Sequence, residues 1–306
     1  MAKRKLSKLR GFAFVLLFLV VLAITYPIWF FLKLFKLTPN HIRNVDGNLE
    51  TPIVSYIHPE TKKIIVFIAT IHIGDPEYFS SILKLIEGLS NNGYKILYES
   101  IKSLTSEEEE ALTEKEIAVK KRLAYLSTLL ERVGKIDGYQ HQTDGLDLDN
   151  AQDRGWISND IKGYEVVRFL AEKNIFTRSS DDDFKSIDRL VDSGLMNIAI
   201  GIGLRVFAFL SFIGEFSPWF NRERRIFKKF ILHERNKIAF AGIEEYPNDN
   251  IVNIWGAGHL PGIEKKIKAA GYVECNRKWI VAYRNRPIVI NFEGIKNMVE
   301  NEDQLG

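Results

Sequence analysis

Two stretches that lie far apart in this chain share one layout. The first runs from Ile64 to Tyr94 and the second from Asn250 to Tyr272. Each begins with a run of β-branched residues, passes through a turn of small residues to a histidine, and continues past a proline into a helical pattern that ends in Gly-Tyr. A strand followed by a helix is the repeating unit of α/β folds. The layout therefore predicts two strand–histidine–helix units in one sheet.

The histidines of the two units, His72 and His259, each follow a predicted buried strand. In an open α/β sheet, ligands bind in the crevice beyond the carboxyl ends of the strands. A single histidine near a strand end usually has a structural role, whereas two histidines in matching repeats point to one composite site. We expect both side chains near the centre of one sheet, related by pseudo-twofold symmetry.

The rest of the pattern alternates strands and helices. This alternation favours an α/β (or α+β) domain over residues 53–295, with the duplicated units on a central mixed sheet. Ser106 and Glu109 have the spacing of a capping box, which predicts one long helix from Glu107 to Val133. Strands are predicted at 53–57, 64–69, 95–98, 279–283 and 288–291, and further helices at 77–89, 161–173 and 221–239.

The N-terminal end of the chain favours a membrane anchor. The run from Gly11 to Leu32 carries no charge, and as a helix it would be about 33 Å long, which matches a hydrocarbon core of about 30 Å. It is longer than the apolar core of a cleaved signal peptide, and the heavier basic flank precedes it, which keeps the N-terminus in the cytoplasm. We predict a cytoplasmic tail (1–10), a transmembrane signal anchor (11–35), a linker (36–52), the extracytoplasmic domain and a C-terminal tail (296–306).

A second apolar stretch runs from Ser193 to Phe220 and contains Arg205. A charged residue near the bilayer centre costs about 2.5–3.5 kcal/mol. A spanning helix here would also put His72 and His259 on opposite sides of the membrane. We therefore expect a buried or membrane-apposed helical cap. The basic residues that follow could face anionic lipid headgroups or form a solvated helix face.

Charge and cysteine content exclude several kinds of function. The chain has 306 residues, with 42 Lys and Arg against 39 Asp and Glu, and this net charge of +3 is too balanced for a nucleic-acid-binding protein. The single cysteine, Cys275, rules out an intrachain disulfide and a thiolate-rich zinc site. Cys275 also lacks a neighbouring glycine turn of the kind that accompanies a catalytic nucleophile, so the sequence does not favour a catalytic role for it.

Glu99 ends a third predicted strand, so we expect it at the same sheet edge as His72 and His259. Two imidazoles and a carboxylate are a common ligand set for a catalytic divalent metal with open positions, here manganese, cobalt or zinc. Such an ion acidifies a bound water or polarises a carbonyl. Without a metal, the three side chains could act as a general base and its orienting acid. Glu99 could also simply cap a neighbouring helix.

Four further residues are candidates for supporting roles. Arg235 and Asn236 could stabilise developing negative charge, or they could take part in a surface salt bridge. Asp160 precedes a predicted helix and is either a partner of the N-terminal helix dipole or a site residue. His141 lies in a polar loop and is a candidate for a position just behind the catalytic residues.

The segment GAGHLPGI, from Gly256 to Ile263, resembles the C-terminal signature of the TraB/PrgY/GumN family, which includes the Tiki proteases. The resemblance covers about residues 53–292. The first histidine motif departs from the family at Ala69, where glycine is usual. Four other segments occur in the family's order: ATIHIG with His72, LYES with Glu99, WISNDI with Asp160, and ERN with Arg235 and Asn236.

The resemblance implies a duplicated α/β core with paired GxxH motifs and a carboxylate between them. It also implies a membrane-anchored, metal-dependent protease. In this chain His72, Glu99 and His259 would form the metal or catalytic centre, and Arg235 and Asn236 would lie beside it.

The sequence as a whole predicts a single-pass membrane protein whose extracytoplasmic domain hydrolyses peptide bonds with a divalent metal ion. Its expected partners are the lipid bilayer and a peptide or protein substrate, with no nucleic acid. One alternative is a non-catalytic membrane regulator that binds or sequesters a peptide, and another is a metal-free esterase-like hydrolase. A third is a haem-binding lipoprotein-like relative, against which the lack of a lipobox cysteine speaks.

Overall fold

The computed structural model divides the chain into units at Met1–Asn40 and His41–Gly306, and only the second contains described residues. The predicted anchor (11–35), the predicted cap (193–220) and the predicted strand at 288–291 lie outside them. No helix of the described part is both long and apolar enough to cross a membrane. The structure describes residues 41–134, 138–175, 177 and 229–284.

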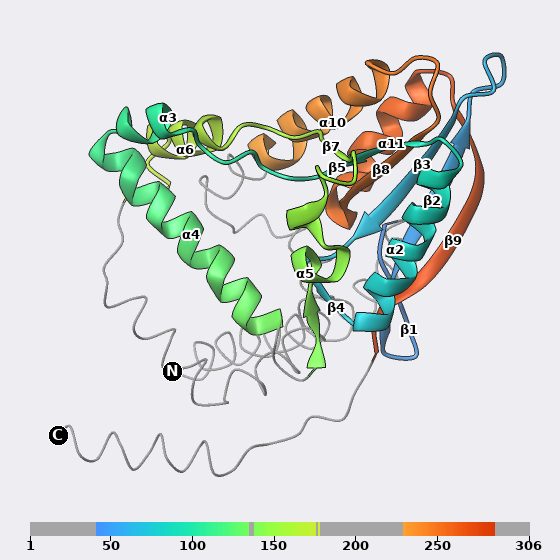
Figure 1. Ribbon diagram of the computed structural model, residues 1–306, viewed down its shortest axis with the longest axis horizontal. Helices are drawn as coiled ribbons and strands as arrows, with labels where there is room; N and C mark the ends of the chain where they lie inside the picture. Colours follow the sequence, from blue (N-terminus) through green and yellow to red (C-terminus); the bar gives the residue numbers. More distant parts are fainter. Residues whose placement is uncertain (1–40, 135–137, 176, 178–228, 285–306) are drawn as a thin grey trace, which may run out of the picture. The chain divides into compact units, whose positions relative to one another are not determined.

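A seven-stranded mixed sheet forms the centre of this unit, as the sequence predicted (Figure 1). Its strands are β1 (Arg43–Val45), β2 (Asn48–Ile57), β3 (Ile64–Thr70), β5 (Lys95–Tyr98), β7 (Ile157–Ser158), β8 (Ile251–Gly256) and β9 (Val273–Tyr283). They follow the order β1-β2-β3-β8-β5-β7, and β9 pairs with β2 beside this path. β3, β8, β5 and β7 are parallel to one another, so their carboxyl ends meet at one edge. β2 is antiparallel to its partners β1, β3 and β9.

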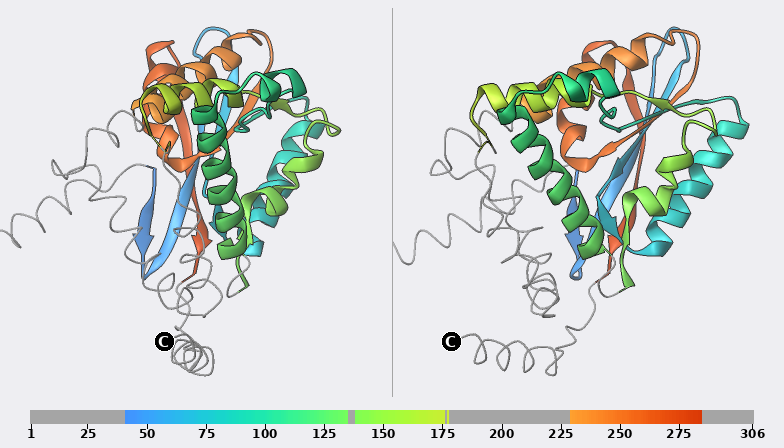
Figure 2. Two further views of the ribbon diagram at one scale, coloured as in Figure 1. Left: turned by 90° about the vertical axis from the view of Figure 1, so that its left-hand side faces the viewer. Right: turned by 60° about the vertical axis from the view of Figure 1, so that its left-hand side comes forward.

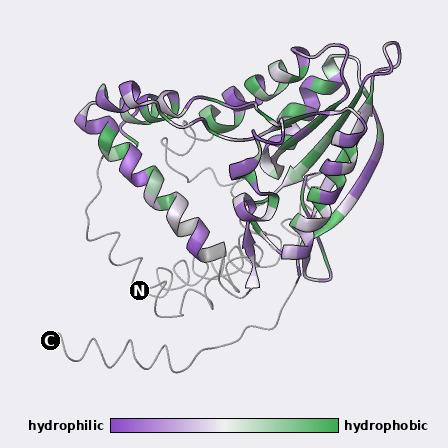
Figure 3. Cartoon of the chain, in the orientation of Figure 1, coloured by the Kyte–Doolittle hydropathy of each residue, from purple (hydrophilic) through white to green (hydrophobic). Residues whose placement is uncertain are grey.

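The central strands are buried on both faces, which explains their continuous apolar sequences. In β3, which reads IIVFIAT, every residue from Ile65 to Thr70 is buried. Strands that are covered by helices on both faces read as hydrophobic runs and do not alternate with polar residues. Figure 3 shows this apolar centre in green. Because side chains alternate between faces, Val66 and Ile68 join one core cluster and Ile65 and Phe67 the other.

The helices of the two strand–histidine–helix units cover opposite faces of the sheet (Figure 2). α2 (Pro76–Asn91) packs on one face, and α11 (Leu260–Ala269) packs on the other beside α10 (Arg235–Glu244). Both α2 and α11 carry a proline in their first turn, where the missing N–H costs no hydrogen bond. After the adjacent strands β3 and β8, the chain therefore continues to helices on opposite faces of the sheet. Such a switch point is where open α/β sheets bind ligands.

The prediction of one long helix from 107 to 133 is wrong. The segment forms two helices, α3 (Ser106–Glu110) and α4 (Glu114–Gly134). The capping box is made by Thr105 and Glu108, one residue earlier than predicted. Thr113 and Glu116 exchange the same kind of backbone hydrogen bonds at the start of α4. Two Thr-x-x-Glu sequences thus start two helices.

Three other boundaries differ from the predictions. β1 and the start of β2 occupy much of the predicted linker (36–52), because their partly exposed polar residues pair at the border of the sheet. β9 begins well before the predicted strand at 279–283. The described part of the predicted helix at 221–239 is a π-helical turn, η3 (Lys229–Glu234), followed by α10, which continues to Glu244. The predicted helices at 77–89 and 161–173 are confirmed as α2 and α6 (Gly163–Glu172).

Candidate functional site

The parallel strands bring most of the predicted site residues to one edge of the sheet. Glu99 directly follows β5, Asp160 comes shortly after β7, and His259 ends the short helix η4 (Ala257–His259) that follows β8. Arg235 and Asn236 reach the same edge from the first turn of α10. These five side chains form the cluster that we call the edge site.

A buried ionic cluster lies at the base of the edge site. Arg235 Nε lies 2.8 Å from Asp160 Oδ1, and Arg235 Nη2 lies 2.6 Å from Asp160 Oδ2. The same Nη2 also donates to Glu99 Oε1 at 2.6 Å. Asp160 Oδ1 accepts a further hydrogen bond from the backbone N–H of Ile161. Arg235 therefore makes no surface salt bridge, and Asp160 belongs to the site.

Glu99 is held as a carboxylate. Its Oε2 accepts a hydrogen bond from the backbone N–H of Gly256 at 2.6 Å. Burial alone would raise the pKa of the Glu99 carboxyl. The Arg235 guanidinium opposes burial most strongly, and together with His259, the Gly256 N–H and His72 it holds that pKa below its ordinary value. At Asp160 burial is the largest effect, and it raises the pKa of the carboxyl although Arg235 lowers it.

His259 is a buried and neutral imidazole. Its Nδ1 lies 2.7 Å from Asn236 Oδ1, and its ring meets the Trp255 ring edge-on at 4.9 Å between centroids. Burial lowers the pKa of His259 to about 4; the charge of Glu99 opposes this shift, and the charges of Arg235 and His72 add to it. Because an amide oxygen only accepts hydrogen bonds, Nδ1 carries the proton. The free lone pair is then on Nε2, which lies 3.7 Å from Glu99 Oε1.

His72 lies apart from this cluster and is exposed. After β3 the chain forms β4 (Ile73–Gly74), which pairs with β6 (Gln140–His141) before α2 begins. The rings of His72 and His141 are nearly parallel with 6.3 Å between centroids, and the backbone N–H of Gln142 donates to the His72 carbonyl. His141 itself accepts from the Thr143 N–H at the start of α5 (Gln142–Leu146). His72 is still near enough for its charge to lower the pKa of both Glu99 and His259.

The predicted metal ligands do not form a complete ligand set. Among the described residues, no three His, Cys, Asp or Glu side chains come together as a group that could hold a metal ion. The donor chemistry fits at two positions, since His259 presents a neutral Nε2 and Glu99 an ionised carboxylate 3.7 Å away. His72, the third predicted ligand, is exposed.

Three residues that contact the edge site were missed by the sequence predictions. The backbone N–H of Gly256 binds Glu99, the Trp255 ring packs on both His259 and Arg235, and Gly262 contacts the Asn236 amide. All three lie in or beside the GAGHLPGI segment. The glycines on either side of His259 were the available signal.

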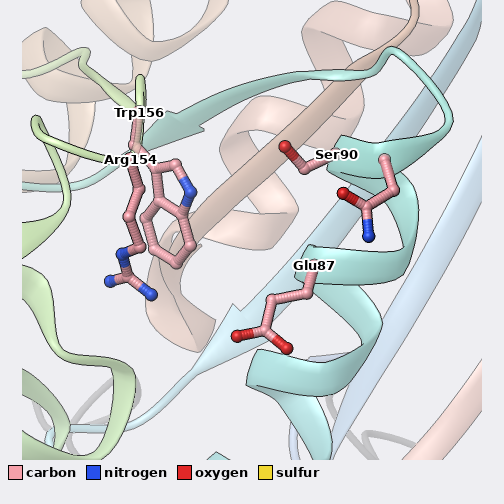
Figure 4. Close-up of a pocket in the computed structure, with 5 residues that line it drawn as sticks. Glu87, Ser90, Arg154 and Trp156 are labelled. Atoms are coloured by element: carbon pink, nitrogen blue, oxygen red, sulfur yellow. The ribbon is translucent and has the colours of Figure 1, made fainter.

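A hollow lies away from the edge site (Figure 4). The Arg154 guanidinium carbon sits 4.2 Å from the Trp156 ring centre, and its Nη2 donates to two backbone carbonyls. Glu87 lines the same hollow from the last turns of α2, which run back toward the amino ends of the strands. The hollow therefore shares no residue with the edge site.

In comparisons with known proteins, no family model and no curated protein matches this chain. The resemblance to the TraB/PrgY/GumN family therefore stays a prediction, and the case for a function depends on the site itself.

Proposed function

We propose that the chain is a hydrolase that cleaves peptide bonds, with its reaction centre at the edge site. The observation that carries the proposal is the state of His259. Its Nδ1 is occupied by Asn236, while its Nε2 has a free lone pair that faces the carboxylate of Glu99. A neutral imidazole in this state is suited to take a proton from an attacking water or to bind a metal ion.

The neighbouring residues have roles that follow from their charges. Glu99 would orient the water and stabilise the positive charge that His259 gains when it accepts a proton. Arg235 keeps Glu99 ionised and is itself fixed by Asp160. His72, which is exposed, is free to meet a substrate and to donate a proton to the leaving amine. His259 takes one proton from water and His72 gives a different proton to the amine; before the next turnover His259 releases its proton to solvent and His72 takes one up.

A divalent metal ion is the proposed cofactor, with manganese, cobalt and zinc as candidates. In the metal-dependent form of the proposal, His259, Glu99 and His72 would hold the ion in place of the acid–base roles given above, and when bound the ion would acidify a water molecule. We also propose membership of the TraB/PrgY/GumN family. The supporting observations are the order of the five sequence segments and the two strand–histidine–helix units on neighbouring parallel strands, which fit a duplicated core. Anchoring by residues 11–35, an extracytoplasmic location and a helical cap at 193–220 are parts of the same proposal.

One observation favours a second function, that of a non-catalytic membrane regulator which binds a peptide. Both oxygens of Glu99 are already engaged, one by Arg235 and one by Gly256. A carboxylate with such partners also suits a purely structural ion pair. This alternative predicts peptide binding without turnover.

The test compares the full chain, purified in detergent, with His259→Gln and His58→Gln. His58 lies in the turn between β2 and β3 and serves as the matched control. Each protein is incubated with manganese, cobalt or zinc, analysed for bound metal by mass spectrometry, and assayed on a mixed peptide library. We expect stoichiometric metal and peptide cleavage in the wild type and the His58 variant, and neither in the His259 variant.

The other outcomes discriminate among the alternatives. Cleavage that survives chelation would contradict the metal and favour a metal-free, esterase-like hydrolase. Peptide binding without cleavage in the wild type would overturn the hydrolase proposal in favour of the regulator. Cleavage that persists in the His259 variant would remove the edge site from the reaction.

A further inference from the structure

Gly262 leaves room for the side chain of Asn236. A Cβ atom placed on Gly262 would lie 2.0 Å from Asn236 Nδ2 and 3.1 Å from its Cγ. Neither distance allows a methyl group without movement of the amide, because carbon and nitrogen atoms that are not bonded pack at about 3.5–4.0 Å. The α11 backbone is therefore in direct contact with the amide, and only glycine fits at this position.

The opposite end of the same amide holds His259. Asn236 Oδ1 lies 2.7 Å from His259 Nδ1, and both residues are buried. Gly262 lies in the first turn of α11 and His259 immediately precedes that helix, and both are next to Asn236 of α10. The Asn236 amide is thus confined between the Gly262 backbone on one side and the His259 ring on the other.

We propose that Gly262 is a positioning residue: it leaves the space in which Asn236 holds its Oδ1 against His259 Nδ1, and this contact fixes the tautomer of His259. With the amide oxygen toward the ring, the proton stays on Nδ1 and the lone pair stays on Nε2, the nitrogen that faces Glu99. Partners of this kind set both the tautomer and the ring direction of functional histidines. The use of that lone pair rests on the proposed function, whereas the fixing of the tautomer does not.

The matched control comes from the same segment. Gly258 directly precedes His259, and a Cβ atom there would meet no atom within 4 Å. Neither glycine has a positive φ angle, so alanine is compatible with the backbone at both positions. Gly262→Ala and Gly258→Ala thus differ in whether the new methyl group strikes Asn236.

The experiment is nitrogen NMR on the full chain in detergent, with ¹⁵N-labelled histidine, at neutral pH and with a chelator present. The His259 signals are identified by their loss in His259→Gln. We expect the wild type and Gly258→Ala to show a protonated Nδ1 and an unprotonated Nε2. Gly262→Ala should lose this pattern and resemble Asn236→Ala. An unchanged pattern in Gly262→Ala would overturn the inference.

A double-mutant comparison covers the case in which Gly262→Ala folds poorly. In the Asn236→Ala background the amide is gone, so the new methyl group has space and alanine favours the helix over glycine. Gly262→Ala should lower the melting temperature of the wild type but leave that of Asn236→Ala unchanged or raise it. An equal loss in both backgrounds would overturn the inference, because no coupling would then exist between the two residues.

The result of the tautomer experiment can be distinguished from the result of the peptide-cleavage assay that tests the proposed function. If the tautomer pattern behaves as expected and no peptide is cleaved, the positioning role of Gly262 stands and the hydrolase proposal fails. If peptides are cleaved and Gly262→Ala leaves the pattern unchanged, the hydrolase stands and the positioning role fails.

Discussion

Arg235 Nη2 lies 2.6 Å from Glu99 Oε1, and only 7% of the Arg235 side chain and 12% of the Glu99 side chain are exposed. The same guanidinium also binds Asp160, whose side chain is fully buried. One cation therefore serves two buried acids. Each acid also accepts one backbone N–H, that of Gly256 for Glu99 and that of Ile161 for Asp160. The pKa of Asp160 is raised because burial and the charge of Glu99 act on it together, whereas the pKa of Glu99 is lowered because Arg235 and the two histidines outweigh its burial. The stability of the edge site should depend strongly on this one arginine.

Arg235→Met is expected to destabilise the protein by about 3–5 kcal/mol, because it leaves buried carboxylates without their cation. Methionine keeps much of the length of the side chain, so the loss reports the charge and hydrogen bonds more than the volume. The measurement is urea unfolding of the full chain at neutral pH.

The control for this prediction is Lys237→Met in the same helix. Lys237 pairs with Glu234 at 2.9 Å, but both side chains are largely exposed. An exposed pair contributes only about 0–1 kcal/mol. Equal losses in the free energy of unfolding for Arg235→Met and Lys237→Met would show that the buried cluster contributes no more to stability than an exposed ion pair.

The lowered pKa of His259 predicts a dependence of stability on pH. Its pKa in the folded protein is about 4, whereas an unfolded histidine titrates near pH ~6.5. Below pH ~6.5 the unfolded chain binds a proton that the folded protein does not, so stability falls as the pH is lowered. Between about pH 7 and about pH 5 the loss from this residue should be about 2 kcal/mol.

His259→Gln should abolish this part of the pH dependence, and His58→Gln should keep it. Urea unfolding at the two pH values, with a chelator present, measures the difference. Working above about pH 5 keeps the ordinary titration range of Asp and Glu out of the comparison. A wild type and a His259 variant with the same slope would contradict the buried neutral imidazole.

Much of the fold and of the edge site was predictable from the sequence. Continuous apolar runs followed by helical patterns predict parallel strands under helices, and parallel strands deliver their carboxyl-terminal residues to one edge. This reasoning put Glu99 and His259 together, and the structure also brings Asp160 and Arg235 there.

The position of His72 could not be predicted from the sequence. It depends on β4 and β6, which have two residues each and carry no periodic pattern. The contact of Gly256 with Glu99 is made by a backbone N–H, which every residue except proline carries, so the small size of Gly256, whose Cβ would lie 3.1 Å from Glu99 Oε2, is its only mark in the sequence. The break between α3 and α4 was readable in principle, because Thr113 and Glu116 repeat the spacing of Thr105 and Glu108.

Tyr78 ties the end of β3 to β2 and α2. Its hydroxyl donates to the Ala69 carbonyl at 3.0 Å and lies 2.9 Å from Thr51 Oγ1. Tyr78→Phe should cost about 1–3 kcal/mol, because Thr51 and Ala69 lose a buried partner. In a Thr51→Val background the cost should be smaller, since fewer polar groups are then left unpaired. Thermal unfolding of the four proteins tests this, and strictly additive losses would contradict it.

Asn253 is a buried amide in the middle of β8, between Phe67 of β3 and Leu97 of β5. It is 0% exposed, and neither its Oδ1 nor its Nδ2 has a hydrogen-bond partner among the described residues. A buried amide without partners is costly, so Asn253→Leu, of similar shape, should raise the free energy of unfolding by about 1–3 kcal/mol. The control is Asn159→Leu, because Asn159 donates to the Ala239 carbonyl at 2.9 Å and packs against Gly242. That substitution should destabilise the protein. Urea unfolding measures both, and a loss at Asn253 comparable to that at Asn159 would show that its amide is paired in solution.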